Sequence, residues 1–150
     1  MNRGFMLIKE ELLTYKKEDI LLPQRATKHS AGYDFYLPCD VVLKANKTTK
    51  VKTNLKAYMM EDEVLFLFIR SSFAIKKGIT LTNNVGIIDS DYFSNEDNDG
   101  EIIACLTNNT AEDIYLKKGD RFIQGIFLKY LTVDSDTSTK LRKGGIGSTK

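Results

Sequence analysis

The chain lacks the residues that usually mark a metal-bound or disulfide-stapled protein. Its 150 residues include no tryptophan, one histidine and two cysteines. The single histidine, His29, argues against a zinc site built from histidines. Cys39 and Cys105 match no metal-binding or redox spacing. We therefore expect reduced thiols in a cytoplasmic protein.

Long hydrophobic runs and a strong excess of one charge are also missing. The apolar run at the N-terminus is interrupted by Lys9, Glu10 and Glu11, too early for a signal-peptide core, and no run approaches transmembrane length. Lysine and arginine total 22 against 20 acidic residues, a net charge of +2. A dedicated nucleic-acid-binding protein would carry a concentrated basic face. We therefore expect neither a membrane nor a nucleic acid as a partner.

What the sequence does have is a succession of short apolar or alternating runs separated by polar clusters, the pattern of an all-β sandwich or barrel. A hydrophobic content of 42% over 150 residues suits one domain with a sizeable core. Val64–Ile69 is apolar throughout and should be central, with both faces covered. Leu7–Lys17 is ambiguous. The predicted strands are Lys50–Met59, Val64–Ile69, Gly86–Ile88, Glu101–Thr107 and Arg121–Leu131.

One short helix is predicted over Ser71–Lys77, with Ser71 or Ser72 capping its start and Gly78 its end. The acidic segment 94–100, SNEDNDG, predicts an exposed loop. A tolerated surface insertion explains it better than a role in subunit contact or in gating a site. Residues 134–150 are poor in apolar side chains. The prediction is a β-rich domain over residues 1–133 and a flexible C-terminal arm over residues 134–150.

The segment 82–92, TNNVGIIDSDY, carries the groups most suggestive of chemistry. Asn83 and Asp89 are an even number of residues apart, so a continuous strand in a β-hairpin would place both side chains on one face. An amide can bind the edge of a flat polar base, and a carboxylate can orient water as a general base. Asp91 and Tyr92 follow at once. The plainer interpretation of this D-S-D segment is a solvated β-turn.

Three further segments offer groups that bind phosphate. Arg70, Ser71 and Ser72 stand at a predicted helix start, where a cation, hydroxyls and backbone N–H groups could meet an anion. Helix capping and a surface arginine explain this motif about as well. Gln124 lies on a predicted strand and could reach a phosphate or another subunit. The tail 142–149, RKGGIGST, could wrap a polyphosphate with its glycine amides, the alternative being simple disorder.

Taken together and in this order, these segments resemble the five motifs of the trimeric dUTPases (deoxyuridine 5′-triphosphate nucleotidohydrolases). The resemblance runs from about Pro23 to the C-terminus. It implies a jelly-roll β-fold, a homotrimer with sites built from all three subunits, and Mg²⁺-dependent conversion of dUTP to dUMP and pyrophosphate. The matching segments are 31–35 (AGYDF), 70–72 (RSS), Asn83 with 86–92 (GIIDSDY), 119–124 (GDRFIQ) and 144–149 (GGIGST).

Carried over residue by residue, the resemblance implies roles as well. Asp89 would activate the water that attacks the α-phosphorus, Asn83 would read the uracil edge, and Tyr92 would pack against the deoxyribose. Asp34 would support the metal and phosphate region from a neighbouring subunit, and the arm of the third subunit would close over the γ-phosphate. The implied substrate-binding residues are Arg70, Ser71, Ser72, Asn83, Gly86, Ile88, Tyr92, Gln124, Arg142, Gly145, Ile146, Gly147, Ser148 and Thr149.

Three features depart from the family pattern. Ile146 stands where many members have an aromatic that stacks on the uracil, so aliphatic packing or another aromatic would replace it. Arg142 lies one position closer to the glycine pair than the family arginine does. The link after Tyr92 is lengthened by residues 94–99.

Two alternative functions share this fold. dCTP deaminases carry a catalytic glutamate where this chain has Cys105, which argues against cytosine deamination. A non-catalytic nucleotide sensor or protein-binding regulator is the other alternative. The intact Asp89 and the phosphate-binding segments weigh against it.

Overall fold

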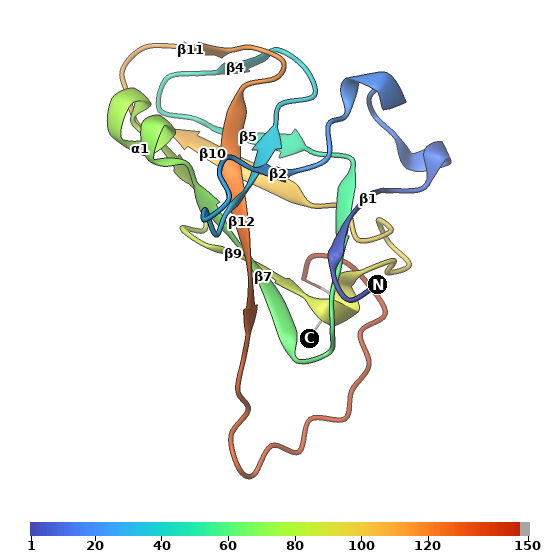
Figure 1. Ribbon diagram of the computed structural model, residues 1–150. Helices are drawn as coiled ribbons and strands as arrows, with labels where there is room; N and C mark the ends of the chain where they lie inside the picture. Colours follow the sequence, from blue (N-terminus) through green and yellow to red (C-terminus); the bar gives the residue numbers. More distant parts are fainter. Residues whose placement is uncertain (148–150) are drawn as a thin grey trace.

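The computed structural model describes residues 1–147, so the predicted binding residues Ser148 and Thr149 lie outside the described part of the chain. Figure 1 shows short strands arranged in layers, with the helix at one end and a long C-terminal arm at the other. Within residues 1–147 no helix is long and apolar enough to cross a membrane. The expected all-β fold with one short helix is confirmed.

Two antiparallel sheets form the body of the molecule. The larger has the order β2-β3-β12-β7-β9, and the smaller has the order β5-β10-β8. Two further strand pairs, β1-β6 and β11-β4, complete an open, jelly-roll-like sandwich. The strands are β1 (Gly4–Leu7), β2 (Gln24–Arg25), β3 (Tyr33–Tyr36), β4 (Val41–Leu43), β5 (Thr48–Lys52), β6 (Leu55–Tyr58), β7 (Glu63–Ile69), β8 (Ile79–Leu81), β9 (Gly86–Asp89), β10 (Ile103–Asn108), β11 (Ile114–Leu116) and β12 (Arg121–Lys129).

The core lies between the inner faces of these sheets. Side chains from both sheets form one buried hydrophobic cluster, among them Phe35 and Leu65 from the larger sheet and Leu81 and Leu106 from the smaller. Burying this apolar surface is the main force that holds the sheets together. The two cysteines are free thiols in the structure, as expected.

The outer face of the larger sheet is apolar in its middle and only partly covered. Phe66 on β7 lies opposite Ile126 on β12 and Ile87 on β9, and directly paired residues share a face. Ile87 is 61% exposed, and Phe66 and Phe68 are half-buried. The prediction that β7 would be covered on both faces is therefore wrong within one chain. We call the row Ile87, Phe66 and Ile126 the outer apolar row.

Several predicted elements need correction. The segment Lys50–Met59 is two strands, because the chain turns at Asn54, which has a φ of 54°. The buried amide of Asn54 accepts hydrogen bonds from the N–H groups of Thr14 and Tyr15, and the two strands pair in different sheets. The ambiguous segment Leu7–Lys17 contains the end of β1 and a 3-10 helix, Glu10–Leu12.

Other strand limits move by one or two residues: β7 begins at Glu63, β9 ends at Asp89, β10 spans Ile103–Asn108, and β12 ends at Lys129. Short strands that sequence patterning missed are β1, β2, β3, β4, β8 and β11.

The helix α1 spans Ser71–Lys77, as predicted, and is capped by Gly78, which has the left-handed conformation (φ 65°). Its start differs from the prediction. Arg70 occupies the N-cap position, and no side chain caps the helix there, so neither serine does so.

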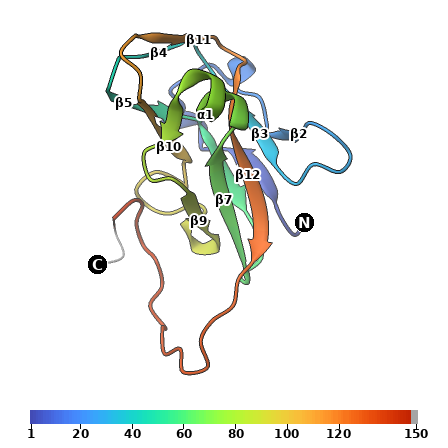
Figure 2. The ribbon, with the colours of Figure 1, turned by 90° about the vertical axis from the view of Figure 1, so that its left-hand side faces the viewer.

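After β12 the chain runs without regular structure through residues 130–147. Figures 1 and 2 show this arm looping away from the sheets and returning beside the end of β9. A 3-10 helix, Ser90–Tyr92, follows β9 at the point where the arm returns. The remaining 3-10 helix of the described chain is Lys17–Asp19.

Candidate functional site

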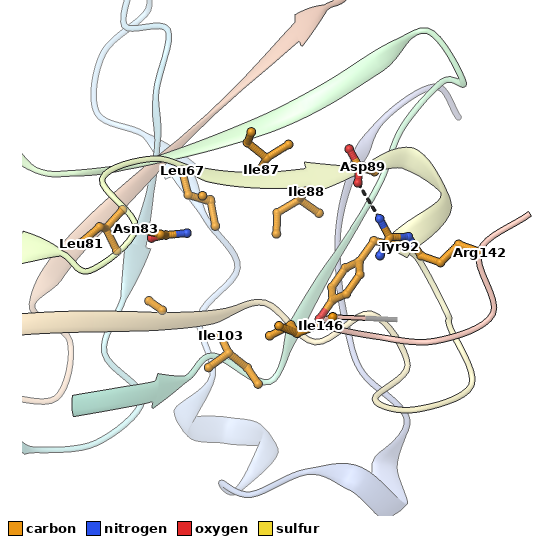
Figure 3. A pocket seen from close by; sticks show the side chains of 13 residues that line it. Leu67, Leu81, Asn83, Ile87, Ile88, Asp89, Tyr92, Ile103, Arg142 and Ile146 are labelled. Atoms are coloured by element: carbon orange, nitrogen blue, oxygen red, sulfur yellow. Dashed lines mark hydrogen bonds and ion pairs between the residues drawn. The ribbon is translucent and has the colours of Figure 1, made fainter. Parts of the chain in front are cut away.

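A cavity of about 270 Å³ opens between the edges of the two sheets. Leu67, Leu81 and Ile103 form much of its apolar wall, and Figure 3 shows Ile88 and Asn83 directed toward the same space. The lining comprises Leu67, Leu81, Asn83, Gly86, Ile87, Ile88, Asp89, Tyr92, Ile103, Ala104, Arg142, Ile146 and Gly147. Eight of these are predicted site residues that the fold brings together.

Asn83 and Asp89 reach the cavity from different local structures. The chain turns at Asn84 (φ 61°), and β8 and β9, on either side of that turn, pair in different sheets. The predicted continuous strand and hairpin are therefore wrong. Gly86 begins β9 where the backbone passes close to its neighbour, because an added Cβ would stand 3.0 Å from Cβ of Leu67.

The carboxylates of Asp89 and Asp91 are joined by one arginine of the arm. Arg142 donates from Nη2 to Oδ2 of Asp89 at 2.6 Å and from Nε to Oδ1 of Asp91 at 2.9 Å. Both carboxylates are half exposed, whereas the Arg142 side chain is 12% exposed. The D-S-D segment thus leads into a 3-10 helix, and its two carboxylates bind the Arg142 guanidinium, so it is not a simple solvated turn.

Tyr92 is buried beneath this ion pair. Its hydroxyl donates to the backbone oxygen of Glu101 at 2.9 Å and accepts from Nδ2 of Asn98 at 2.8 Å. Burial raises the pKa of the Tyr92 phenol, because the charged form would lose its hydration. The Arg142 guanidinium lies 5.7 Å from the centre of the Tyr92 ring. These contacts fix the Tyr92 ring as one wall of the cavity.

The prediction of an exposed loop over residues 94–100 holds only in part. Ser94, Glu96 and Asp97 are exposed, whereas Asn95 and Asp99 are buried. Asp99 accepts hydrogen bonds from Nζ of Lys56 at 2.7 Å and from the N–H of Lys9 at 2.9 Å. The loop also bonds the arm, as described below. Sequence reasoning missed this role because the loop contacts partners far away in the chain.

A second cluster gathers the predicted phosphate-binding residues. The Asp34 carboxylate pairs with Nε of Arg70 at 2.9 Å and with Nη1 of Arg121 at 3.2 Å. Together with Ser71, Ser72 and Gln124, Asp34 and Arg70 line a cavity of about 400 Å³, closed on other sides by Ala26, Ser30 and Gly32. Arg121 is a further member of this cluster, through its pair with Asp34, and the sequence interpretation did not name it as a site residue.

Within one chain these two clusters are separate. Their cavities share no lining residue. Asp34 and Gln124 are paired across β3 and β12 at one end of the outer face of the larger sheet, and Asp89 lies opposite Val64 at the other end. The outer apolar row lies between them. Within a single chain, the second cluster, which contains the predicted phosphate-binding residues, therefore does not lie against Asp89.

The fold and the site together define the class of protein. It is an all-β sandwich with an apolar cavity bordered by the amide of Asn83 and the carboxylate of Asp89, and with a separate arginine–serine cluster.

Comparisons with known proteins identify the family. The dUTPase family model matches residues 18–150. The deoxyuridine 5′-triphosphate nucleotidohydrolase of Lactococcus lactis is 42% identical over 149 residues, covering 98% of this chain and 97% of that protein. The crystal structure of the dUTPase from Streptococcus mutans has a TM-score of 0.78 and 44% identity, covering 87% of this chain and 98% of that one. The chain belongs to the dUTPase family.

A dUTPase from phage phi11 of S. aureus, whose structure shows the coordination of a structural Mg(II) ion, has a TM-score of 0.72 at 19% identity. The match covers 93% of this chain and 98% of the phage protein, and the two share the fold.

Proposed function

We propose that this protein hydrolyses dUTP to dUMP and pyrophosphate. The observation that carries the proposal is the grouping of Asn83, Asp89 and Tyr92 around one cavity with apolar walls. A flat base can enter between the apolar side chains while Asn83 and nearby backbone bond its polar edge. A base with the donor pattern of cytosine would leave buried polar groups unpaired, which is a strong source of discrimination.

In the proposed reaction, Asp89 accepts a proton from a water molecule as the water oxygen attacks the α-phosphorus. The bond between the α-phosphorus and the bridging oxygen to the β-phosphate breaks, and pyrophosphate leaves. In the structure Arg142 donates a hydrogen bond to the Asp89 carboxylate. On substrate binding, Arg142 would exchange this carboxylate for a phosphate oxygen and free Asp89 to bind the water.

The phosphate groups would lie against the second cluster, contributed by another subunit. Arg70, the hydroxyls of Ser71 and Ser72, and Gln124 supply the donors. Two features support a homotrimer with shared sites: the separation of the clusters within one chain, and the partly exposed outer apolar row between them. Packing that row against a neighbouring copy would bury apolar surface and bring one chain's cluster toward another chain's Asp89.

The arm in the structure lies against the cavity of its own chain. In the trimer we propose that it crosses to a neighbouring subunit. Gly145, Ile146 and Gly147 would then close over the bound nucleotide there, with Ile146 packing in place of the aromatic of other family members. The last strand, β12, ends at Lys129, and we propose that the chain after it is long enough to reach a neighbour.

Mg²⁺ fits this site as an ion carried by the triphosphate. Residues 1–147 contain no group of three or more histidine, cysteine or acidic side chains placed to hold a metal, and both oxygens of Asp34 are paired with arginines. Mg²⁺ commonly binds through substrate phosphates and waters with few protein carboxylates. When bound, it would neutralise charge on the phosphates, and Asp34 would act through Arg70.

Mixing the purified protein with dUTP and Mg²⁺ should release one pyrophosphate and one dUMP per substrate, and dCTP should react far more slowly. Binding of dUTP without pyrophosphate release would instead indicate a sensor, and ammonia released from dCTP would indicate a deaminase. Either result overturns the proposal. Light scattering should report three copies per particle. The cytoplasmic location stays a prediction.

A further inference from the structure

The loop 94–100 is held rigidly on the body of the molecule. The buried Asp99 carboxylate binds Lys56 and the backbone of Lys9. The Asn95 side chain accepts from the N–H groups of Asp97 and Asn98, at 3.0 and 3.1 Å, and donates to the Tyr92 backbone oxygen. A segment with this many buried bonds is a preorganised surface and not a mobile insertion.

Two hydrogen bonds join this surface to the arm. The N–H of Gly145 donates to Oδ2 of Asp97 at 2.7 Å, and the N–H of Glu96 donates to the Lys143 backbone oxygen at 3.1 Å. Gly144 and Gly145 are buried there, although most of the arm is exposed. A Cβ on Gly145 would stand 3.4 Å from Oδ1 of Asn98, so the backbone lies directly on the loop.

The position of these contacts links them to the cavity. Gly145 immediately precedes Ile146 and Gly147, which line the cavity, and Arg142 on the other side reaches Asp89. The same loop fixes Tyr92 through Asn98. Charge also favours the contact, because the arm segment 140–143, KLRK, is basic and the loop is acidic.

We propose that the loop 94–100 is the docking surface for the C-terminal arm and that Asp97 is its positioning residue. By accepting the Gly145 N–H, Asp97 sets where Ile146 and Gly147 close over the cavity. The assignment holds for an arm of the same chain or of a neighbour, since the loop stays with the cavity it serves. Its catalytic consequence rests on the proposed function, whereas the docking itself does not.

The test compares three variants at exposed positions of one loop. Asp97→Ala removes the acceptor, Asp97→Asn keeps an acceptor oxygen without the charge, and Glu96→Ala is the matched control. Glu96 bonds the arm only through its backbone N–H, so its side chain can be removed without loss of that bond. All three should unfold at the same temperature as the wild type.

The first measurement is tryptic cleavage within the arm at Lys140, Arg142 and Lys143 in the absence of nucleotide. Asp97→Ala should be cleaved on the order of tenfold faster than the wild type, because a charge-assisted hydrogen bond holds the closed arm. Glu96→Ala should resemble the wild type, and Asp97→Asn should recover much of the protection. Equal cleavage of Asp97→Ala and Glu96→Ala would overturn the proposal.

The second measurement is dUTP turnover. Asp97→Ala should lose on the order of tenfold in kcat/KM, with Asp97→Asn in between and Glu96→Ala near the wild type. Unchanged turnover in Asp97→Ala with faster cleavage would overturn the positioning role. A wild type inactive on dUTP would overturn the proposed function alone, since the cleavage assay still decides the docking.

Discussion

Replacing Lys56 by methionine should strongly destabilise this protein. Lys56 and Asp99 form a buried ion pair whose side chains are 9% and 1% exposed, with Nζ 2.7 Å from Oδ2. The other carboxylate oxygen of Asp99, Oδ1, is buried without a hydrogen-bond partner in the described structure. Methionine keeps the contact with the Phe93 ring, over which Lys56 lies at 4.7 Å, but leaves the carboxylate uncompensated.

Removing one partner of a buried ion pair typically costs about 3–5 kcal/mol. The N–H of Lys9 would still bond Asp99 at 2.9 Å, which places the expected loss near the lower end of that range. For a chain of this size, a loss of about 3 kcal/mol lowers the melting temperature by roughly 6–12 °C.

The assay is urea unfolding at one fixed protein concentration, because the proposed trimer would make apparent stability depend on concentration. Lys52→Met is the matched control: its side chain is 49% exposed and lies 3.9 Å from Glu101, so the expected cost is below about 1 kcal/mol. The double variant Lys56→Met/Asp99→Asn should recover most of the loss, since no buried charge remains. Asparagine tolerates the left-handed backbone at this position (φ 57°) and still accepts from the N–H of Lys9. If Lys56→Met were no less stable than Lys52→Met, the reasoning would be refuted.

Three further predictions concern Asp89, the arm and the Lys56–Asp99 pair. Asp89→Asn should lower kcat by about 10²–10⁴-fold while dUTP still binds, measured by pyrophosphate release and calorimetry; an active variant would remove Asp89 from the role of base. Truncation after Asp136 should also inactivate the protein. If the proposed trimer forms and its arms act on neighbouring subunits, mixing truncated with Asp89→Asn chains should restore activity; if each arm serves its own chain, the mixture should stay inactive. Burial opposes the ionisation of Asp99, yet bonds from Lys56 and Lys9 hold its pKa below the ordinary 3.8. The stabilisation by this pair is therefore complete above pH 3.8 and lost as the pH falls through the lowered pKa, so the difference in unfolding free energy between wild type and Lys56→Met should shrink in acid.

Patterning predicted the elements whose signals are local. Adjacent residues were enough to predict the apolar run of β7, the helix α1 with the glycine that ends it, and the start of β12. The spacing of apolar residues and the residue types of turns are signals that act over a few positions. Six short strands were missed, since strands of two to four residues carry too little periodicity to stand out. The break at Asn54 was also missed, because its amide is satisfied by Thr14 and Tyr15, about 40 positions away.

The candidate site divides in the same way. Asn83, Asp89 and Tyr92 were named from one segment, and the structure brings them to one cavity. Their local geometry was not predicted correctly, because β8 and β9 join different sheets, and strand pairing is a long-range choice.

The sequence by itself determined the fold class, the family motifs and the chemical types present at the site, since residue identity alone sets what a side chain can donate, accept or bury. Only the tertiary structure decided that the cavity lined by Asn83 and Asp89 lies apart from the arginine–serine cluster within one chain. It also revealed that the acidic loop is anchored by a buried Lys56–Asp99 pair and bonded to the arm through Asp97. These outcomes depend on contacts between residues 40 or more positions apart, and hydrogen bonds of that range leave no periodic trace in the chain.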